Sequence, residues 1–206
     1  MEFRQVVRRR HMTRSYDSRP IPDDVLTRVL DAGRRAPSAG FSQGVTFLVL
    51  NTPAATANFW HHVSDDPAPG GRWDRLRVAP AIVLPLGDPK VYLDRYAEPD
   101  KAPLGLQHAT AWPVPYWQVD AAFSAMSILL AATDEGLGAL FFGLATGEAG
   151  VRDDLGIPDR IGLIGAITLG YPASDDPPSP SLRRGWRPAH ETVHWGQWTE
   201  PPPGRS

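Results

Sequence analysis

Apolar positions recur at helical or strand spacing over most of the first 172 residues of this chain. Helical spacing with start and stop residues predicts helices over 2–10, 23–35, 54–63, 118–135 and 147–155. Short apolar or β-branched runs predict strands over 45–50, 79–86, 139–144 and 161–169. Five prolines interrupt residues 87–117, where we expect a long irregular loop.

The strongest helical pattern lies in 118–135 and should place one apolar face in the core. The residues that mark this face are Val119, Ala122, Phe123, Met126, Leu129, Leu130 and Thr133. The order of elements predicts one α+β domain, residues 1–172, with a central mixed and mostly antiparallel sheet flanked by helices. Residues 173–206 carry seven prolines and are expected to form an extension. No strand is followed by Gly-x-Gly-x-x-Gly, which argues against a Rossmann fold.

Composition narrows the possible chemistry. The 206 residues contain no cysteine, which excludes disulfides, thiolate catalysis and cysteine-ligated metals. The net charge of −2 argues against nucleic acid as a partner. No apolar stretch is long enough to span a membrane and no secretory signal is recognisable, so we expect a cytoplasmic protein with no membrane partner.

A cationic cluster near the N-terminus stands out against this acidic background. Arg10-His11-Met12-Thr13-Arg14-Ser15-Tyr16 follows Arg8 and Arg9. Arginine forks bind phosphate oxygens in a bidentate way, so the segment is typical of a phosphate clamp. A solvated basic helix end is the alternative interpretation.

Two further segments suggest close approach of backbone to a ligand. Ala36-Pro37-Ser38-Ala39-Gly40 is a turn of small residues after a predicted helix, and it continues to Phe41 and Gln43. Gly136-Leu137-Gly138 leads into the predicted strand over 139–144, which includes Phe142-Gly143. Together with the Arg10–Tyr16 segment, these motifs resemble the FMN-dependent nitroreductase family, and the similarity extends from about Arg8 to Trp198.

The resemblance implies a nitroreductase-like fold in a homodimer whose C-terminal arm wraps the partner. It implies FMN as cofactor and NADH or NADPH as reductant. Reduction of nitroaromatic, quinone or related electron-poor acceptors would follow a ping-pong hydride transfer through flavin N5. Because the flavin carries this chemistry, no catalytic acid, base, nucleophile or metal is expected from the chain.

The same resemblance implies which residues bind. Contacts to FMN are expected from Arg10, His11, Met12, Arg14, Pro37, Ser38, Ala39, Gly40, Phe41, Phe142, Gly143, Arg184 and Arg187. Contacts to the substrate are expected from Phe41. The 87–117 segment has no counterpart in the family pattern, and our own hypothesis is that its aromatics Trp112, Tyr116 and Trp117 form a lid that contacts the substrate. Met12 and Phe41 replace a serine and an asparagine of the family pattern.

Alternatives remain open at this stage. A relative that binds a deazaflavin, cleaves the flavin or binds it without catalysis would carry the same motifs. His190-Glu191-Thr192-Val193-His194 fits a zinc-protease pattern, but Pro188 and Gly196 bracket it too closely for a stable helix. We expect no zinc site there.

Overall fold

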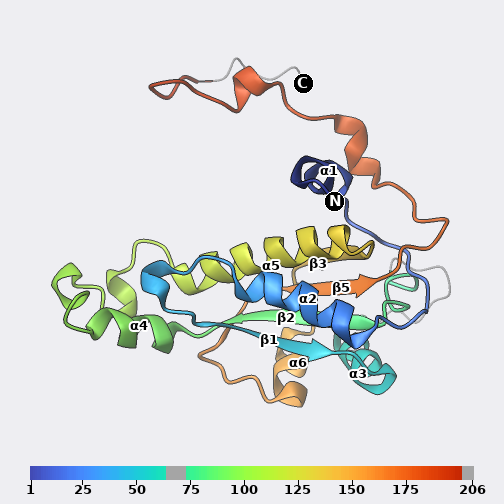
Figure 1. Ribbon diagram of the computed structural model, residues 1–206. Coiled ribbons are helices and arrows are strands. Elements are labelled where there is room, and N and C mark those ends of the chain that lie inside the picture. The colour runs from blue at the N-terminus through green and yellow to red at the C-terminus, as the bar shows by residue number, and fades with distance from the viewer. Residues whose placement is uncertain (64–72, 201–206) are drawn as a thin grey trace. The chain divides into compact units, whose positions relative to one another are not determined.

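The computed structural model describes residues 1–63 and 73–200. The chain forms two compact units, Met1–Asp176 and Pro177–Ser206. The helices of the first unit are α1 (Phe3–Arg9), α2 (Asp23–Arg34), α3 (Pro53–Val63), α4 (Pro89–Ala97), α5 (Tyr116–Asp134) and α6 (Glu148–Leu155) (Figure 1). Its strands are β1 (Val45–Leu50), β2 (Ala81–Gly87), β3 (Gly138–Phe142), β4 (Gly162–Leu163) and β5 (Ala166–Gly170).

The strands form one sheet in the order β1-β2-β5-β3, and β4 pairs with the end of β2. Every pairing between these strands is antiparallel. Among the described residues, the one parallel pairing is an isolated bridge between Met12 and Ala139. The segment after α1 therefore lies along the outer edge of β3.

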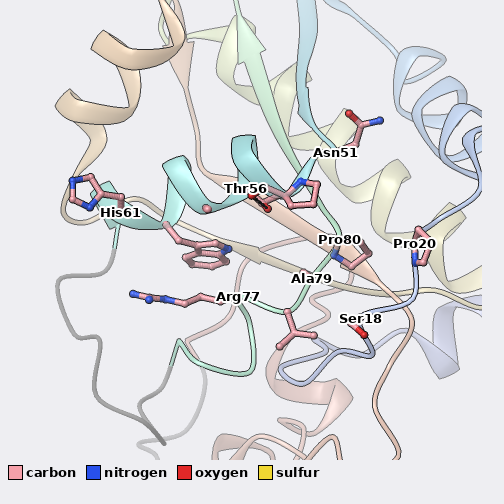
Figure 2. A pocket seen from close by; sticks show the side chains of 12 residues that line it. Ser18, Pro20, Asn51, Thr56, His61, Arg77, Ala79 and Pro80 are labelled. Atoms are coloured by element: carbon pink, nitrogen blue, oxygen red, sulfur yellow. Dashed lines mark hydrogen bonds between the residues drawn. The ribbon is translucent and has the colours of Figure 1, made fainter.

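Two layers of helices cover the sheet, as Figure 1 shows. Strand β2 is buried over its whole length, and its successive side chains point to opposite faces. Ile82 and Leu84 pack with α3 and α6, including Phe59 and Val151. Ala81 and Val83 pack with α2 and α5 on the other face. Helix α3 follows β1 and lies beside the segment that leads into β2 (Figure 2).

Most elements lie within a few residues of their predicted bounds, and β1 matches its prediction at both ends. The predicted strand over 161–169 is interrupted at Gly165, whose φ is +146°, and becomes β4 and β5. The prediction of an irregular 87–117 segment is wrong, because it contains α4 and two 3₁₀ turns. Asp88 caps α4 by accepting a hydrogen bond from the Lys90 N–H, and Pro89 occupies the first turn. This Asp-Pro start was a readable helix signal.

The predicted buried face of α5 is also wrong in part. Phe123 and Met126 are 47% and 44% exposed. The residues that are buried are Asp120, Ala121, Ser124, Ala125, Ile128, Leu129 and Ala132. Apolar residues surround this helix, so periodicity alone did not identify the side that faces the sheet. Small residues on the buried side allow α2 and the sheet to approach closely.

No helix among the described residues is long and apolar enough to cross a membrane.

The close approach of α5 to the end of β2 makes a test of packing. A Cβ on Gly87 would lie 2.2 Å from the backbone carbonyl oxygen of Trp117, whereas a Cβ on Gly162 would lie no closer than 3.4 Å to any neighbour. Gly162 pairs with Gly87 in the sheet, so it provides a matched control. We expect Gly87→Ala to lower the free energy of unfolding by about 2 kcal/mol or more, because backbone must move. Gly162→Ala should be close to wild type. Urea unfolding of both variants checks this, and equal losses would contradict it.

Candidate functional site

The cationic N-terminal segment is held rigidly against the edge of the sheet. The Thr13 N–H donates to the Ala139 carbonyl at 3.0 Å, and Tyr16 pairs with Pro172. Tyr16 is 4% exposed, and its hydroxyl lies 2.8 Å from Thr168 Oγ1. Burial raises the pKa of Tyr16 far above its ordinary value, so the phenol remains a neutral anchor. The residues between these anchor points therefore have a fixed position.

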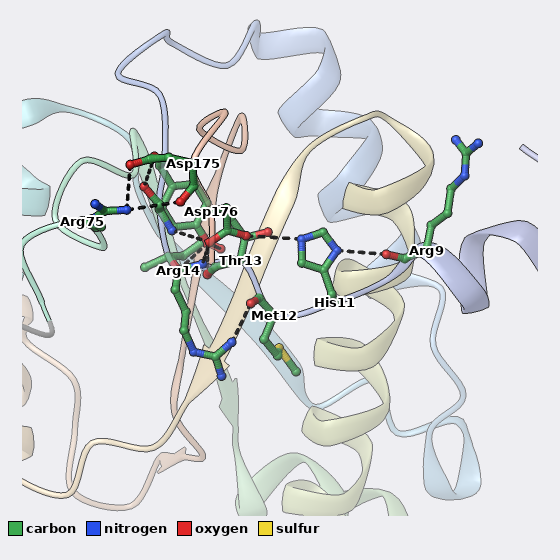
Figure 3. A network of polar contacts seen from close by, with 11 residues as sticks. Arg9, His11, Met12, Thr13, Arg14, Arg75, Asp175 and Asp176 are labelled. Carbon is green, nitrogen blue, oxygen red and sulfur yellow. Dashed lines mark hydrogen bonds and ion pairs between the residues drawn. The ribbon is translucent and has the colours of Figure 1, made fainter. Parts of the chain in front are cut away.

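Two acidic residues face this segment, as Figure 3 shows. One Asp176 carboxylate oxygen accepts the backbone N–H groups of Arg14 and Ser15, at 2.8 and 2.9 Å. The other oxygen lies 3.4 Å from His11 Nε2. The neighbouring Asp175 carboxylate lies 2.8 Å from the Arg75 guanidinium. A ligand anion would therefore find these two backbone donors occupied, and would have to bind the basic side chains.

Those basic side chains form a suitable donor set. Arg10 makes no ion pair with any residue in the described part of the chain. Arg14 directs one guanidinium nitrogen to the Met12 carbonyl at 2.8 Å, which leaves its other N–H groups for a ligand. Guanidinium forks of this kind match phosphate oxygens. Arg75 lies near this set through its ion pair with Asp175. In the sequence it is one of three arginines ahead of the strand, with Arg72 and Arg77, and nothing there singled it out.

The end of β3 offers accessible backbone. The Phe142 ring stacks on Trp60 with a centroid separation of 5.8 Å and an angle of 7°. A Cβ on Gly143 would meet nothing within 4 Å. Open space thus lies beside the main chain here, as close approach of a planar ligand requires. Phe142–Gly143 and Arg10–Arg14 belong to the same edge region of the sheet, since Met12 pairs with β3.

The turn after α2 has a strained backbone. Gly40, Phe41 and Gln43 have φ values of +61°, +55° and +56°. Non-glycine residues in this region are uncommon and require support from their surroundings. Ser38 Oγ accepts the Gln43 N–H at 3.0 Å, and Phe41 is 76% exposed. The turn therefore presents an aromatic ring and small residues to the outside, including Pro37.

Helices α4 and α5 provide that support. The Asp120 carboxylate is 2% exposed and accepts both the Ala39 N–H and the Tyr92 hydroxyl, each at 2.8 Å. Burial first, and the adjacent carboxylate second, raise the pKa of Tyr92, so the phenol keeps its proton and donates it. Arg95 Nε donates to the Gly40 carbonyl at 3.0 Å, and a Cβ on Gly40 would lie 2.8 Å from the Tyr96 ring. The sequence did not identify Asp120 as a residue that supports the turn, because an acid inside an apolar helix pattern does not show which residues it contacts.

The three candidate lid aromatics differ in their surroundings. Trp112 is 9% exposed, donates its indole N–H to the Leu106 carbonyl at 2.8 Å and packs against Tyr96 at 4.7 Å. Trp117 is half-buried beside it, and Tyr116 is 40% exposed. Trp112 is thus part of the packing that supports the turn, and Tyr116 presents the larger accessible surface.

The turn and the cationic segment are far apart within one chain. Asp120, which binds the turn, lies near the start of α5, whereas Met12 pairs with Ala139 beyond its end (Figure 1). From Asp120 to the end of the helix at Asp134 the axis runs about 21 Å, at a rise of ~1.5 Å per residue. The structure does not bring these two predicted parts of the site together in one chain.

The remaining candidates belong to the second unit. Arg184 ends the 3₁₀ helix Pro180–Arg184, and the Arg187 guanidinium lies 3.3 Å from the Glu191 carboxylate. His190 lies in the 3₁₀ helix Ala189–Glu191, which ends before His194. The two histidines of the zinc-protease pattern therefore do not share an α-helical turn. No group of three or more metal-ligating side chains occurs among the described residues.

Comparisons with known proteins agree with this architecture. Residues 7–171 match the Nitroreductase family. An Archaeoglobus fulgidus protein, provisionally named NADH dehydrogenase/NAD(P)H nitroreductase, is 27% identical over 177 residues, which is 84% of this chain and 87% of that protein. A Staphylococcus aureus NADPH-dependent oxidoreductase is 25% identical over 173 residues, covering 83% of this chain and 65% of the relative.

A solved structure described as an FMN-dependent nitroreductase from Clostridium difficile has the same fold, with a TM-score of 0.67. It is 18% identical, and the match covers 94% of this chain and 98% of that one. Since the family match spans most of the sequence, the chain belongs to the Nitroreductase family.

Proposed function

We propose that this protein is an FMN-dependent oxidoreductase that uses NAD(P)H to reduce electron-poor acceptors such as nitroaromatics and quinones. The observation that carries the proposal is the rigid cationic segment at the edge of β3, beside the open backbone of Phe142–Gly143. Family membership supports it, as do the descriptions of the S. aureus relative as an NADPH-dependent oxidoreductase and of the C. difficile protein as an FMN-dependent nitroreductase.

The basic side chains would hold the cofactor phosphate. Arg10 and Arg14 supply guanidinium forks. His11 lies at the same end, where its two ring nitrogens contact the Arg9 carbonyl and the Asp176 carboxylate, so it would have to exchange one of these contacts to reach the phosphate. Arg184 and Arg187 are further candidates from the second unit. Met12 packs into the core, so its contribution is the backbone and not a hydroxyl. When bound, FMN supplies the redox chemistry, and the protein supplies position and charge.

The separation of the two parts of the site supports a homodimer. If the Ala36–Phe41 turn contacts a flavin, the separation of about 21 Å along α5 assigns that flavin to the Arg10–Arg14 segment of another copy. Exposed apolar side chains on α1 and α5 support such an interface: Phe3 and Val7, with Phe123 and Met126. We assign the Pro-rich extension, residues 173–206, to the partner's surface in this dimer.

The exposed Phe41 ring and Tyr116 are the residues that we assign to acceptor contact. Both are aromatic, and aromatic rings stack well on flat electron-poor compounds. Trp112 and Trp117 would act indirectly, by supporting the Ala36–Phe41 turn.

The visible spectrum of the purified protein tests the cofactor. We expect flavin absorption bands that bleach when NADPH or NADH is added under nitrogen and return when a quinone is added. Bands that do not bleach would indicate a protein that binds flavin without catalysis. A colourless protein that takes up a deazaflavin but not FMN would contradict the proposal.

The phosphate clamp can be tested by comparing FMN with riboflavin, which lacks the phosphate. We expect Arg10→Met to weaken FMN binding about tenfold or more, since a charge-assisted contact is lost. Riboflavin binding should be unchanged. Arg4→Met is the control, because Arg4 is an exposed residue near the start of α1, six positions before Arg10. Equal losses for FMN and riboflavin would contradict a phosphate contact for Arg10.

The support of the turn by Asp120 gives a second prediction for flavin binding. Asp120→Ala removes the acceptor of the Ala39 N–H, so the turn should shift and flavin affinity should fall about tenfold. Tyr92→Phe keeps that acceptor, and should lower stability by about 1 kcal/mol with little change in flavin affinity. Asp120→Asn keeps an acceptor oxygen and should restore much of the binding. If both Asp120→Ala and Tyr92→Phe reduced flavin affinity in proportion to stability, the positioning role would be wrong.

A further inference from the structure

Helix α4 lies beside the turn that follows α2 and contacts it at both of its own ends (Figure 1). At the start of the helix, the Asp88 N–H donates to the Gly44 carbonyl at 2.9 Å. Near its end, Arg95 Nε donates to the Gly40 carbonyl at 3.0 Å. Between these contacts the packing is close, because a Cβ on Gly44 would lie 2.5 Å from the Tyr92 ring. The helix therefore limits how far the turn can move.

The Arg95 side chain is held in one direction by its other partners. Its two terminal nitrogens bind the two Asp100 carboxylate oxygens, at 2.7 and 2.8 Å, and one of them also lies 3.0 Å from the Glu98 carboxylate. A guanidinium that is paired with a carboxylate in this bidentate way has a fixed plane. The hydrogen bond from Arg95 lowers the pKa of Asp100, which keeps that carboxylate charged at neutral pH. The Gly40 carbonyl therefore meets a charged donor of fixed orientation.

The carbonyl that Arg95 binds belongs to the strained part of the turn. It lies in the peptide group that joins Gly40 to Phe41, whose φ values are +61° and +55°. Because a peptide group is planar, a fixed carbonyl direction also fixes how the chain enters Phe41. The Phe41 ring is 76% exposed, so packing of the ring itself does not hold this backbone conformation. The surroundings of the backbone must do so.

Asp120 and Arg95 hold different parts of the turn. The Asp120 carboxylate accepts the Ala39 N–H, which lies before the residues of positive φ. Arg95 binds the peptide group directly before Phe41. Asp120 thus fixes where the turn begins, whereas Arg95 fixes the direction in which Phe41 leaves the backbone.

We propose that Arg95 is a positioning residue for the acceptor: it orients the Phe41 ring through the Gly40 carbonyl, and thereby favours flat aromatic acceptors over acceptors without a ring. This inference rests on the proposed function, in which Phe41 contacts the acceptor. A ring that is already ordered loses little freedom when a flat compound stacks on it, whereas a mobile ring must first be ordered. Arg95 acts through the backbone and needs no contact with the acceptor.

Amide hydrogen exchange of the full-length chain without acceptor tests the structural part. The Phe41 and Ser42 N–H groups donate to carbonyls within the turn, so their exchange reports its opening. We expect Arg95→Met to speed exchange of both amides about tenfold or more, because a charge-assisted hydrogen bond is lost. Exchange of strand β2 should not change. Lys90→Met is the matched control, since exposed Lys90 pairs with Asp94 within the same helix.

Steady-state kinetics at saturating FMN tests the acceptor role. The acceptors are menadione, a flat quinone, and ferricyanide, an inorganic anion with no ring to stack. Arg95→Met should lower the ratio of kcat/KM for menadione to kcat/KM for ferricyanide about tenfold, mainly through the KM for menadione. Arg95→Lys and Asp100→Asn should give smaller changes, because each leaves part of the contact. In a Phe41→Ala background, Arg95→Met should cause no further change in this ratio.

Three results would overturn the proposal. They are unchanged exchange of Phe41 and Ser42 in Arg95→Met, an unchanged ratio between the two acceptors, and an undiminished effect of Arg95→Met in the Phe41→Ala background. Asp100→Asn changes an exposed residue and provides a second variant if Arg95→Met fails to fold. A protein that reduces neither acceptor would contradict the proposed function and the acceptor role together, whereas the exchange data would still decide whether Arg95 holds the turn.

Discussion

Strand β2 is buried along its whole length, and the rest of the first unit is arranged around that constraint. A strand with apolar side chains on both faces must be covered twice. Helices α2 and α5 cover one face, and α3 and α6 cover the other. In the order β1-β2-β5-β3, strands β2 and β5 occupy the middle of the sheet, so β1 and β3 lie at its edges. The cationic segment can be held beside β3 because that edge is open to it.

Buried polar groups at the ends of the sheet fix the segments that we assign to function. The Tyr16 hydroxyl holds the cationic segment through Thr168, and the Asp120 carboxylate holds the Ala36–Phe41 turn. Each such group is satisfied, which is the condition under which a buried polar group specifies one geometry. In both places a neutral phenol or a buried carboxylate that accepts two hydrogen bonds sets the position of backbone that must meet a ligand.

Residue patterns predicted nearly all of the helices and strands, but they predicted less well which side of each one is buried. The predicted buried side of α5 was wrong in part, because Phe123 and Met126 are apolar and yet exposed. Contact with a second copy of the chain would explain their exposure. Helix α4 was not predicted because the prolines of residues 87–117 indicated a loop, although Pro89 in a first helical turn is favourable. Arg75 and Asp120 could not be assigned, since the partners that define their roles are distant in the sequence.

The sequence by itself therefore determined the α+β class, the order of most elements, the cationic segment and the turn of small residues after α2, because these depend on local spacing, charge and the chemistry of short motifs. Tertiary structure decided which side of α5 is buried, how Asp120 supports the turn, and that the turn and the cationic segment lie at opposite ends of that helix. The physical reason is that these features arise from contacts between residues far apart in the chain, whose geometry is set only when both faces of the sheet are packed.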